Sequence, residues 1–376
     1  MLLCADMHSG CGGRVVFDDV TGAASSGDPT SGNTTSSDST TGQPSTTNSS
    51  SSGTIPCEGC ASPTLCCGGE CVSSADDPSN CGACGHDCQS AACVDSLCEP
   101  IIIAAPIEKV RAIAVDPTDI YWVTAGTVPG LSKAPLSGGA TTPIATSPLG
   151  PLSLVVSAGH AYWTTSVEEA LMTVPVGGGT PVALFVGSTG ASRVTVDASS
   201  VFFTRVNADT VVKVPIGGGE ADVLASELVS PHGIAVDNSH TYFTTGETVM
   251  RVPIGGGAQS LVAVGHEPRS LVVDDTSVYW IDWGGWVMKA PLAGGLSTQL
   301  APAQVGVGIA IDETFVYFGE ALGDVSKVPI AGGETIPVAL DQTPVGIAVD
   351  ATTVYWANSG TSANDYTDGS IMKIAK

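Results

Sequence analysis

Short runs of alternating apolar and polar residues, separated by Gly, Pro and Asp, fill the chain after Pro100. The repeating unit reads roughly P-x-G-I-A-V-D, then V-Y-W, then V-x-K-V-P-I-G-G-G, then L-V-A, and it recurs every 37 to 41 residues. Alternation with β-branched residues predicts strands, and a period of this length with four strands per unit is typical of propeller blades. The pattern therefore predicts an all-β fold, a seven-bladed β-propeller of four-stranded blades with strands a to d.

Two positions mark each unit. The last residue of strand a is acidic in every unit but the second, at Asp116, Ser157, Asp197, Asp237, Asp274, Asp312 and Asp350. Strand b carries an aromatic pair, at Tyr121-Trp122, Tyr162-Trp163, Phe202-Phe203, Tyr242-Phe243, Tyr279-Trp280, Tyr317-Phe318 and Tyr355-Trp356. Because successive residues of a strand face opposite sides of the sheet, we interpret these pairs as packing between blades.

The last unit has no strand d of its own, because the chain ends at Lys376 soon after strand c. The segment IIIAA at 101–105 precedes the first strand a and is predicted to supply the missing strand, paired near Ile371 and Ile374. Such pairing would close the ring and cover two sheet edges.

Strand c holds a basic residue at one position in six units, at Lys133, Lys213, Arg251, Lys289, Lys327 and Lys373. The second unit has Thr173 there, and it is also the unit with Ser157 in place of the strand-a Asp. The joint loss predicts an ion pair between the two positions within each blade, since a buried carboxylate requires a partner. A calcium site for the Asp residues is the alternative, disfavoured because they are spread one per blade.

The aromatic motif resembles the YWTD-type propellers of lipoprotein receptors and, more loosely, the NHL propellers. Tyr279-Trp280-Ile281-Asp282 keeps the aromatic-aromatic-x-Asp form, whereas the other units carry different residues at the Asp position. The resemblance implies a propeller that binds a ligand. Those families usually have six blades, so seven units here weaken any transfer of ligand specificity.

The formal net charge of −24, with 13 Lys and Arg, disfavours nucleic acid and anionic membranes as partners, because both require a basic face. We also expect no transmembrane segment, since no long apolar run free of Gly and Pro occurs.

Ten of the twelve cysteines lie within 57–98, and none follows Cys98. An even number in so short a segment predicts five disulfides and an oxidising compartment; a zinc site is the alternative. The expected disulfide cysteines are Cys57, Cys60, Cys66, Cys67, Cys71, Cys81, Cys84, Cys88, Cys93 and Cys98. The run resembles a cysteine-rich module of exported myxobacterial proteins, which implies an envelope or extracellular location. We interpret it as a spacer, or alternatively as a small binding module.

The predicted organisation is an N-terminal region at 1–24, a Ser/Thr-rich disordered linker at 25–56, the disulfide module at 57–98 and the propeller at 99–376. The segment "HSGC" has the ending of a bacterial lipoprotein cleavage site, so we hypothesise that the true start lies upstream and that Cys11 is lipidated. The alternative is that Cys4 and Cys11 are incidental.

The remaining candidates for function are the basic and aromatic residues that the repeat does not require. Strand a begins at one mouth of the central channel, and the b–c loops open on the same face. The predicted ligand-binding residues on this face are Arg111, Arg193, His232, Arg269, Asp282, Trp283, Trp286 and Tyr366. Together they favour an anionic or sugar-like ligand. Alternatively, loop acids such as Asp282 and Asp365 neutralise the arginines.

We therefore predict a secreted or lipid-anchored bacterial envelope protein, a monomeric and non-catalytic recognition or scaffold propeller without cofactor or metal, whose partner is a protein or polysaccharide at the cell surface. The alternative is a propeller lyase or lactonase, because His232 in SPHGIAVD resembles the channel-mouth histidines of streptogramin-lyase-like propellers. Glu320 would then lie on the same face. A purely structural envelope component is a third possibility.

Overall fold

The structure is a computed structural model that describes residues 60, 64–146, 150–166, 170–187, 190–303, 306–320 and 323–376. The predictions for Cys11, for Cys57 and for the segments 1–24 and 25–56 lie outside these residues.

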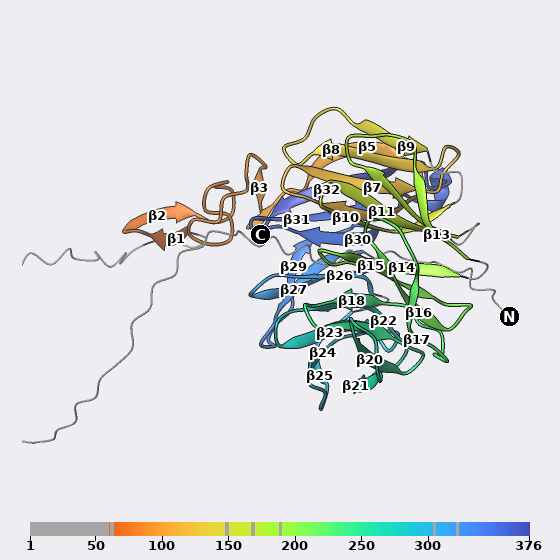
Figure 1. The fold of residues 1–376 in the computed structure, drawn as a ribbon. Coiled ribbons are helices and arrows are strands. Elements are labelled where there is room, and N and C mark those ends of the chain that lie inside the picture. Colours follow the sequence, from red (N-terminus) through yellow and green to blue (C-terminus); the bar gives the residue numbers. More distant parts are fainter. Residues whose placement is uncertain are drawn as a thin grey trace, which may run out of the picture.

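Seven four-stranded antiparallel sheets are arranged as a ring, with strand a of each blade innermost (Figure 1). Blade 1 consists of β6 (Val110–Val115), β7 (Asp119–Thr124), β8 (Gly130–Pro135) and β9 (Thr142–Thr146), and blade 2 of β10 (Pro151–Ser157), β11 (His160–Thr165), β12 (Ala170–Pro175) and β13 (Val182–Val186). Blade 3 consists of β14 (Ala191–Val196), β15 (Ser200–Arg205), β16 (Thr210–Pro215) and β17 (Asp222–Ala225), and blade 4 of β18 (Ile234–Val236), β19 (His240–Thr244), β20 (Thr248–Pro253) and β21 (Ser260–Val264). Blade 5 consists of β22 (Pro268–Val273), β23 (Ser277–Asp282), β24 (Trp286–Pro291) and β25 (Thr298–Pro302), and blade 6 of β26 (Gly306–Ile311), β27 (Phe315–Glu320), β28 (Val325–Pro329) and β29 (Ile336–Ala339). Blade 7 consists of β30 (Pro344–Val349), β31 (Thr353–Asn358), β32 (Gly369–Ala375) and β5 (Ile101–Ile107). The prediction of seven blades is confirmed.

Strand β5 closes the ring as the sequence predicts. It pairs antiparallel with β32, with Ile371 opposite Ala104 and Lys373 opposite Ile101. The first strand in the propeller thus completes the last blade, and Ile103 of β5 is buried in a cluster with residues of blades 1 and 7. The closing pair joins the first and the last strand of the propeller sequence. It therefore couples the stability of the first blade to that of the last.

The strand-b aromatic pairs form the core between blades. Trp163, Trp280 and Trp356 are fully buried, as are most of the paired Tyr and Phe rings. Neighbouring strands a are in contact all around the ring. The interpretation of the pairs as core residues therefore agrees with their burial.

The strand-a Asp organises the turn that joins strands a and b. In six blades one oxygen of this carboxylate accepts hydrogen bonds from the backbone amides two and three residues later, as Asp237 does from Ser239 (2.6 Å) and His240 (2.7 Å). In five of these blades the other oxygen accepts the hydroxyl of the strand-b tyrosine, and the distance from Tyr242 to Asp237 is 2.8 Å. In these five blades the strand-b tyrosine is therefore the partner of the second oxygen, which in Asp312 is shared with Lys376 at 2.6 Å.

The predicted ion pair between strands a and c is wrong. Four of the six strand-c cations reach the next blade instead: Arg251 donates to the carbonyl of Leu292 at 2.6 Å, and Lys289 to that of Ile330 at 2.9 Å. Lys213 and Lys373 make the corresponding bonds to Ile254 and Leu136. In these four blades the cation thus links adjacent blades through a carbonyl that follows strand c, whereas Lys133 pairs at 3.2 Å with Asp119 in strand b of its own blade.

Blade 2 has Ser157 in place of the Asp because its a–b turn is different. Ala158 and Gly159 have positive φ angles of 49° and 75°, which form a tight two-residue hairpin turn that needs no Asp side chain. The presence of Ser157 and Thr173 in place of the Asp and the cation therefore does not indicate a contact between the two positions.

We expect the Asp–Tyr pairs to limit stability at both ends of the pH range. Burial raises the pKa of these carboxyls, but hydrogen bonds outweigh it and the net pKa of Asp116, Asp237, Asp274 and Asp312 is lowered. Burial and the adjacent carboxylate raise the pKa of Tyr121, Tyr242, Tyr279, Tyr317 and Tyr355. A lowered carboxyl pKa stabilises the fold above the unfolded value of about 4, and a raised tyrosine pKa stabilises it below about 10.

The free energy of unfolding, measured with urea across this range, should therefore fall below about pH 4 and above about pH 10. Tyr242→Phe should reduce the alkaline fall. In a double-mutant cycle with Asp237→Asn the two losses should be coupled by about 1 kcal/mol. Additive losses and an unchanged pH profile in Tyr242→Phe would contradict the pairing.

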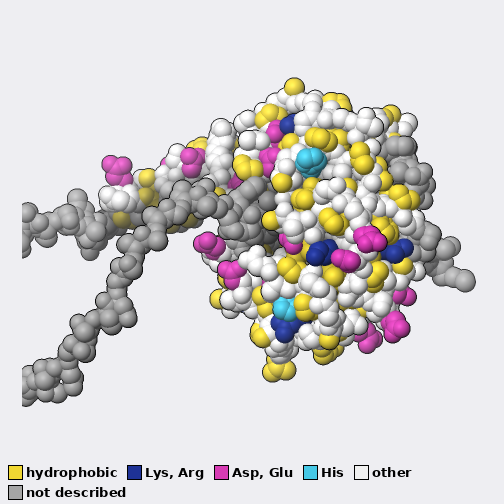
Figure 2. Space-filling model, in the orientation of Figure 1, with side chains coloured by type: hydrophobic (Ala, Val, Ile, Leu, Met, Phe, Trp, Pro, Cys, Tyr) yellow, Lys and Arg dark blue, Asp and Glu magenta, His cyan; other side chains and the backbone are white. Residues whose placement is uncertain are grey.

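Basic side chains are sparse on the face shown in Figure 2, where the dark blue Lys and Arg atoms lie singly and not in a continuous patch. In the described part of the chain, no helix has the length and apolar character of a membrane span. The single helix described there is a 3-10 turn, η1 (Ser362–Asn364).

The cysteine-rich segment forms two small hairpins, β1 (Thr64–Cys67) with β2 (Glu70–Ser73) and β3 (Cys93–Val94) with β4 (Leu97–Cys98). Four disulfides hold it, Cys60–Cys71, Cys67–Cys84, Cys81–Cys93 and Cys88–Cys98, and Cys66 is also disulfide-bonded. The disulfide prediction is thus confirmed for the described cysteines.

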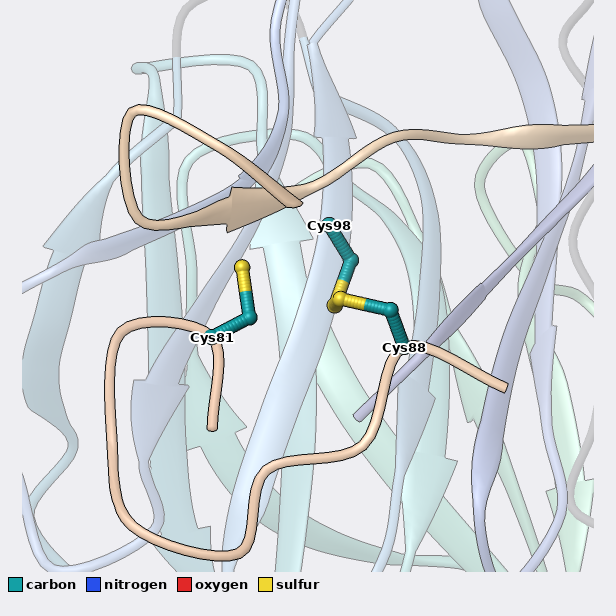
Figure 3. A group of neighbouring side chains, drawn as sticks. All are labelled: Cys81, Cys88 and Cys98. Atoms are coloured by element: carbon teal, nitrogen blue, oxygen red, sulfur yellow. A yellow bond between two sulfur atoms is a disulfide. The ribbon is translucent and has the colours of Figure 1, made fainter. Parts of the chain in front are cut away.

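The zinc alternative was based on closely spaced cysteines, and three of their sulfurs do lie together. Cys81, Cys88 and Cys98 have sulfur atoms within 4.8 Å of one another, and Figure 3 shows Cys81 beside the Cys88–Cys98 bond. All three sulfurs belong to disulfides, so none offers the thiolate that zinc requires. The group is structural.

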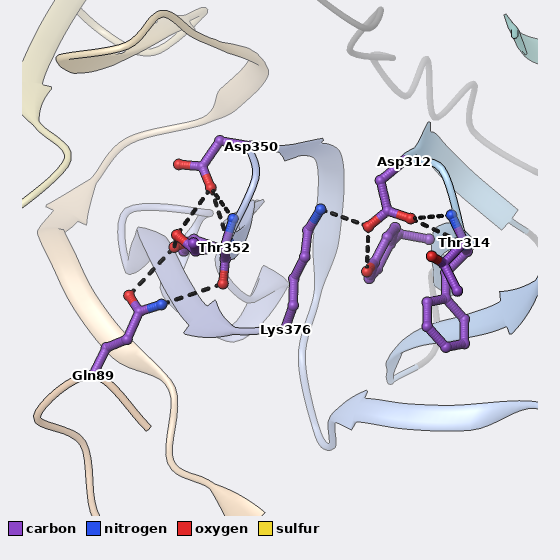
Figure 4. Close-up of polar contacts among 9 residues, drawn as sticks. Gln89, Asp312, Thr314, Asp350, Thr352 and Lys376 are labelled. Carbon is purple, nitrogen blue, oxygen red and sulfur yellow. Dashed lines mark hydrogen bonds and ion pairs between the residues drawn. The ribbon is translucent and has the colours of Figure 1, made fainter. Parts of the chain in front are cut away.

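The disulfide module lies against the end of the ring where the a–b turns of blades 6 and 7 are, which we call the a–b face. Its buried cysteines share an apolar cluster with Ile374 and Ala375, against which Phe315 packs. Gln89 donates to the Thr352 carbonyl at 3.2 Å, and next to this contact the C-terminal Lys376 pairs with Asp312 at 2.6 Å (Figure 4). The module is therefore docked on the propeller.

Candidate functional site

The opposite end of the ring carries the b–c loops and the crossings from strand d to the next strand a, and we call it the b–c face. A cavity of about 680 Å³ lies at this end of blade 4 and extends along the outer strands of that blade. Its described lining comprises Glu227, Leu228, Val229, Ser230, His232, Thr245, Gly246, Glu247, Thr248, Met250, Gln259, Glu267, Pro268 and Arg269. We refer to it as the blade-4 cavity.

The cavity forms where blade 4 departs from the repeat. Its inner strand β18 has three residues, whereas the other inner strands have six or seven. Its b–c loop, residues 245–247 between β19 and β20, is as short as that of blade 5, residues 283–285. The crossing that precedes β18 bends sharply, because Glu227 and Ser230 adopt left-handed conformations with φ of 59° and 47°. The loops around the cavity therefore form a low wall at the b–c end of blade 4.

His232 stands at the start of the shortened inner strand and lines the cavity. Its amide donates to the Thr244 carbonyl at 3.1 Å, and its carbonyl accepts the hydroxyl of Thr204 at 2.8 Å. Thr204 belongs to blade 3 and is fully buried. The backbone of His232 is therefore fixed from both adjacent blades.

Arg269 forms the wall of the cavity on the blade 5 side. Its guanidinium pairs with Glu267 at 3.3 Å and lies over the Trp283 ring, 4.9 Å from the ring centroid. Trp283 is 59% exposed, and its amide donates to the carbonyl of His266 at 2.9 Å. Arg269 thus connects the cavity to an exposed indole at its edge.

Three glutamates line the cavity together with the histidine and the arginine. Glu227 comes from the crossing between blades 3 and 4, Glu247 from the b–c loop and Glu267 from the crossing between blades 4 and 5. Arg269 offsets one of these three negative charges. With His232 neutral, the described lining is net negative.

Asp282 lies beside the cavity wall, buried at the end of β23. It accepts the amide of Trp286 at 3.1 Å, and burial raises the pKa of its carboxyl. Trp286 itself is partly buried against the blade 5 core. Asp282 and Trp286 therefore shape the loop that presents Trp283, and neither is part of the described cavity lining.

From the predicted set, His232 and Arg269 line the cavity, and Trp283 lies against Arg269 at its edge without being part of the described lining. Arg111 in β6 and Arg193 in β14 are half-buried on other blades, and the Tyr366 carbonyl accepts the amide of Lys109 at 2.9 Å near the closing strand. These three are on the b–c face but outside the described lining of the cavity. Glu320, at the end of β27, is outside it as well.

Sequence reasoning missed the glutamates and the hydroxyl groups of the cavity. Ser230, Thr245 and Thr248 line it, and the hydroxyls of Thr245 and Thr248 lie 2.6 Å apart. The signal that was available is the run TTGET at 244–248, which contains the three-residue b–c loop of blade 4. The cavity can offer carboxylates, hydroxyls, an amide, an imidazole and a guanidinium to a polar ligand.

Comparison with known proteins supports both parts of the architecture. The sequence model of the stigma-specific STIG1-like protein family matches residues 39–100, which include the disulfide module. No curated protein sequence matches the chain.

Among solved structures, streptogramin B lyase is similar with a TM-score of 0.61 and 14% identity, covering 73% of this chain and 97% of that one. The computationally designed Ika8 protein is similar with a TM-score of 0.52 and 11% identity, covering 72% and 98%. A structure of a nidogen/laminin complex has a TM-score of 0.45 and 20% identity, covering 50% and 78%. At these identities the first two likenesses show a shared propeller fold.

Proposed function

We propose that the protein is an exported recognition propeller that binds a polar ligand of the cell surface in the blade-4 cavity. The observation that carries this proposal is the cavity itself, because it lies where one blade departs from a regular repeat and collects charged side chains that the fold does not need. Export is supported by the disulfides of the module, which persist in oxidising compartments.

Replacing His232 and Arg269 together by Ala should abolish retention of the protein on isolated cell-surface polysaccharide or envelope protein fractions. The melting temperature should change little, since both side chains are partly exposed. Retention is measured by co-sedimentation, and stability by thermal unfolding of the same samples.

Arg111→Ala is the matched comparison, because Arg111 occupies the same position of the inner strand in blade 1 but lies outside the cavity. It should be retained like the wild type. Equal loss in Arg111→Ala would place binding on the wider b–c face, and full retention of the double variant would exclude the cavity.

Catalysis by a lyase-type mechanism is the second candidate, favoured by the presence of His232 with three carboxylates in one cavity and by the fold shared with streptogramin B lyase. A histidine near such groups can transfer protons. Mass spectrometry of the bound ligand after prolonged incubation distinguishes the two functions. Intact ligand supports recognition, whereas cleavage that His232→Ala abolishes supports the lyase.

A further inference from the structure

The charge of the cavity indicates which kind of polar ligand it would take. Arg269 is paired with Glu267, whereas Glu227 and Glu247 have no ion pair with a base among the described residues. Both of these carboxylates are exposed to solvent on the cavity wall. An anionic ligand would meet repulsion here, and a cationic group would be attracted.

The exposed Trp283 indole at the edge of the cavity adds a second requirement for the ligand. Trp283 presents an aromatic ring that is covered by the Arg269 guanidinium and remains 59% exposed. An exposed ring at the edge of a cavity that offers carboxylates and hydroxyls suits a ligand with an apolar C–H face and several hydroxyl groups, which is the chemistry of a pyranose ring. Thr245, Thr248 and Gln259 add uncharged hydrogen-bonding groups.

We propose that the ligand is a glycan containing amino sugars with free amines. The sugar ring packs against Trp283, its hydroxyls bond to the polar groups of the wall, and its ammonium group lies near Glu227 and Glu247. This inference rests on the proposed recognition function, and it replaces the anionic ligand that the arginines alone suggest.

Three sets of oligosaccharides of equal length separate charge from sugar shape. Chitosan oligomers carry free amines, chitin oligomers carry the same backbone with neutral acetamides, and oligogalacturonates are anionic. By isothermal titration calorimetry, chitosan oligomers should bind the full chain about three- to tenfold more tightly than chitin oligomers, and added salt should reduce the difference. Oligogalacturonates should bind most weakly.

Glu247→Gln should remove most of the preference for chitosan over chitin, because it deletes charge with little change of shape. Glu220→Gln is the matched control, since Glu220 is equally exposed but follows strand c of blade 3 on the a–b face. Trp283→Ala should weaken binding of both sugars.

Equal affinity for chitosan and chitin, or tighter binding of oligogalacturonate, would overturn the inference. If no amino sugar binds while His232 and Arg269 remain necessary for retention on envelope fractions, the ligand class is wrong and the recognition function stands. If retention does not depend on the cavity at all, the proposed function itself fails.

Discussion

Deleting residues 101–105 is expected to destabilise the entire propeller, with loss of a single cooperative unfolding transition. The deletion removes most of β5, so β32 loses its partner and the cluster around Ile103 loses its cover. Because inner strands are in contact all around the ring, an opened blade 7 weakens both of its neighbours. Thermal unfolding followed by far-UV circular dichroism tests this. A truncated protein that melts like the full chain would contradict closure through β5.

Two adjacent residues of β5 provide a milder form of the same test. Ile103 is 7% exposed and Ile102 is 61% exposed, so they occupy opposite faces of one strand. Ile103→Ala should cost about 2 to 5 kcal/mol of unfolding free energy, whereas Ile102→Ala should cost well under 1 kcal/mol. Similar costs for the two would show that the pairing does not bury the predicted face.

Reduction of the disulfides is expected to unfold the N-terminal module while most blades stay folded. The segment has few large apolar residues, and removal of one native disulfide from such a domain typically costs about 2 to 5 kcal/mol. All cysteines precede residue 99, so a reductant acts on no residue of the blades.

Hydrogen exchange with and without reductant reads out each part separately. Amides of 64–98 should lose protection, and amides of β32 should lose some because Ile374 and Ala375 pack against the cysteines. Blades 2 to 4, remote from this contact, are the internal control. Unchanged protection of 64–98 under reduction would show that the disulfides are not what holds the module.

The number of blades, the closing strand and the aromatic core could be predicted because each is repeated seven times or required by the count of strands. The sequence did not allow the same kind of inference for the partner of the strand-a Asp, because it offered both the strand-b tyrosine and the strand-c cation. Strand b and strand c both place a polar group within reach of Asp237, and a single irregular blade cannot decide between them. The geometry does, since the Tyr242 hydroxyl lies 2.8 Å from that carboxylate.

The candidate site was predictable only in part, because it depends on an exception to the repeat. The segment SPHGIAVD fits the repeat as well as the corresponding segments of the other blades do, and nothing in its sequence shows that β18 will have three residues. The left-handed conformations of Glu227 and Ser230 are equally hidden, since neither is glycine. Each glutamate of the cavity lies in a different loop, and loop order along the chain does not reveal which loops converge.

The docking of the module on the a–b face has a consequence for presentation. The module lies on the a–b face, and the chain passes from it directly into β5. The blade-4 cavity is at the other end of the strands. Copies held side by side through their disulfide modules would therefore display their cavities outward, and a polymeric form of the proposed ligand could engage several at once. Avidity of that kind would raise the apparent affinity by orders of magnitude without any new contact.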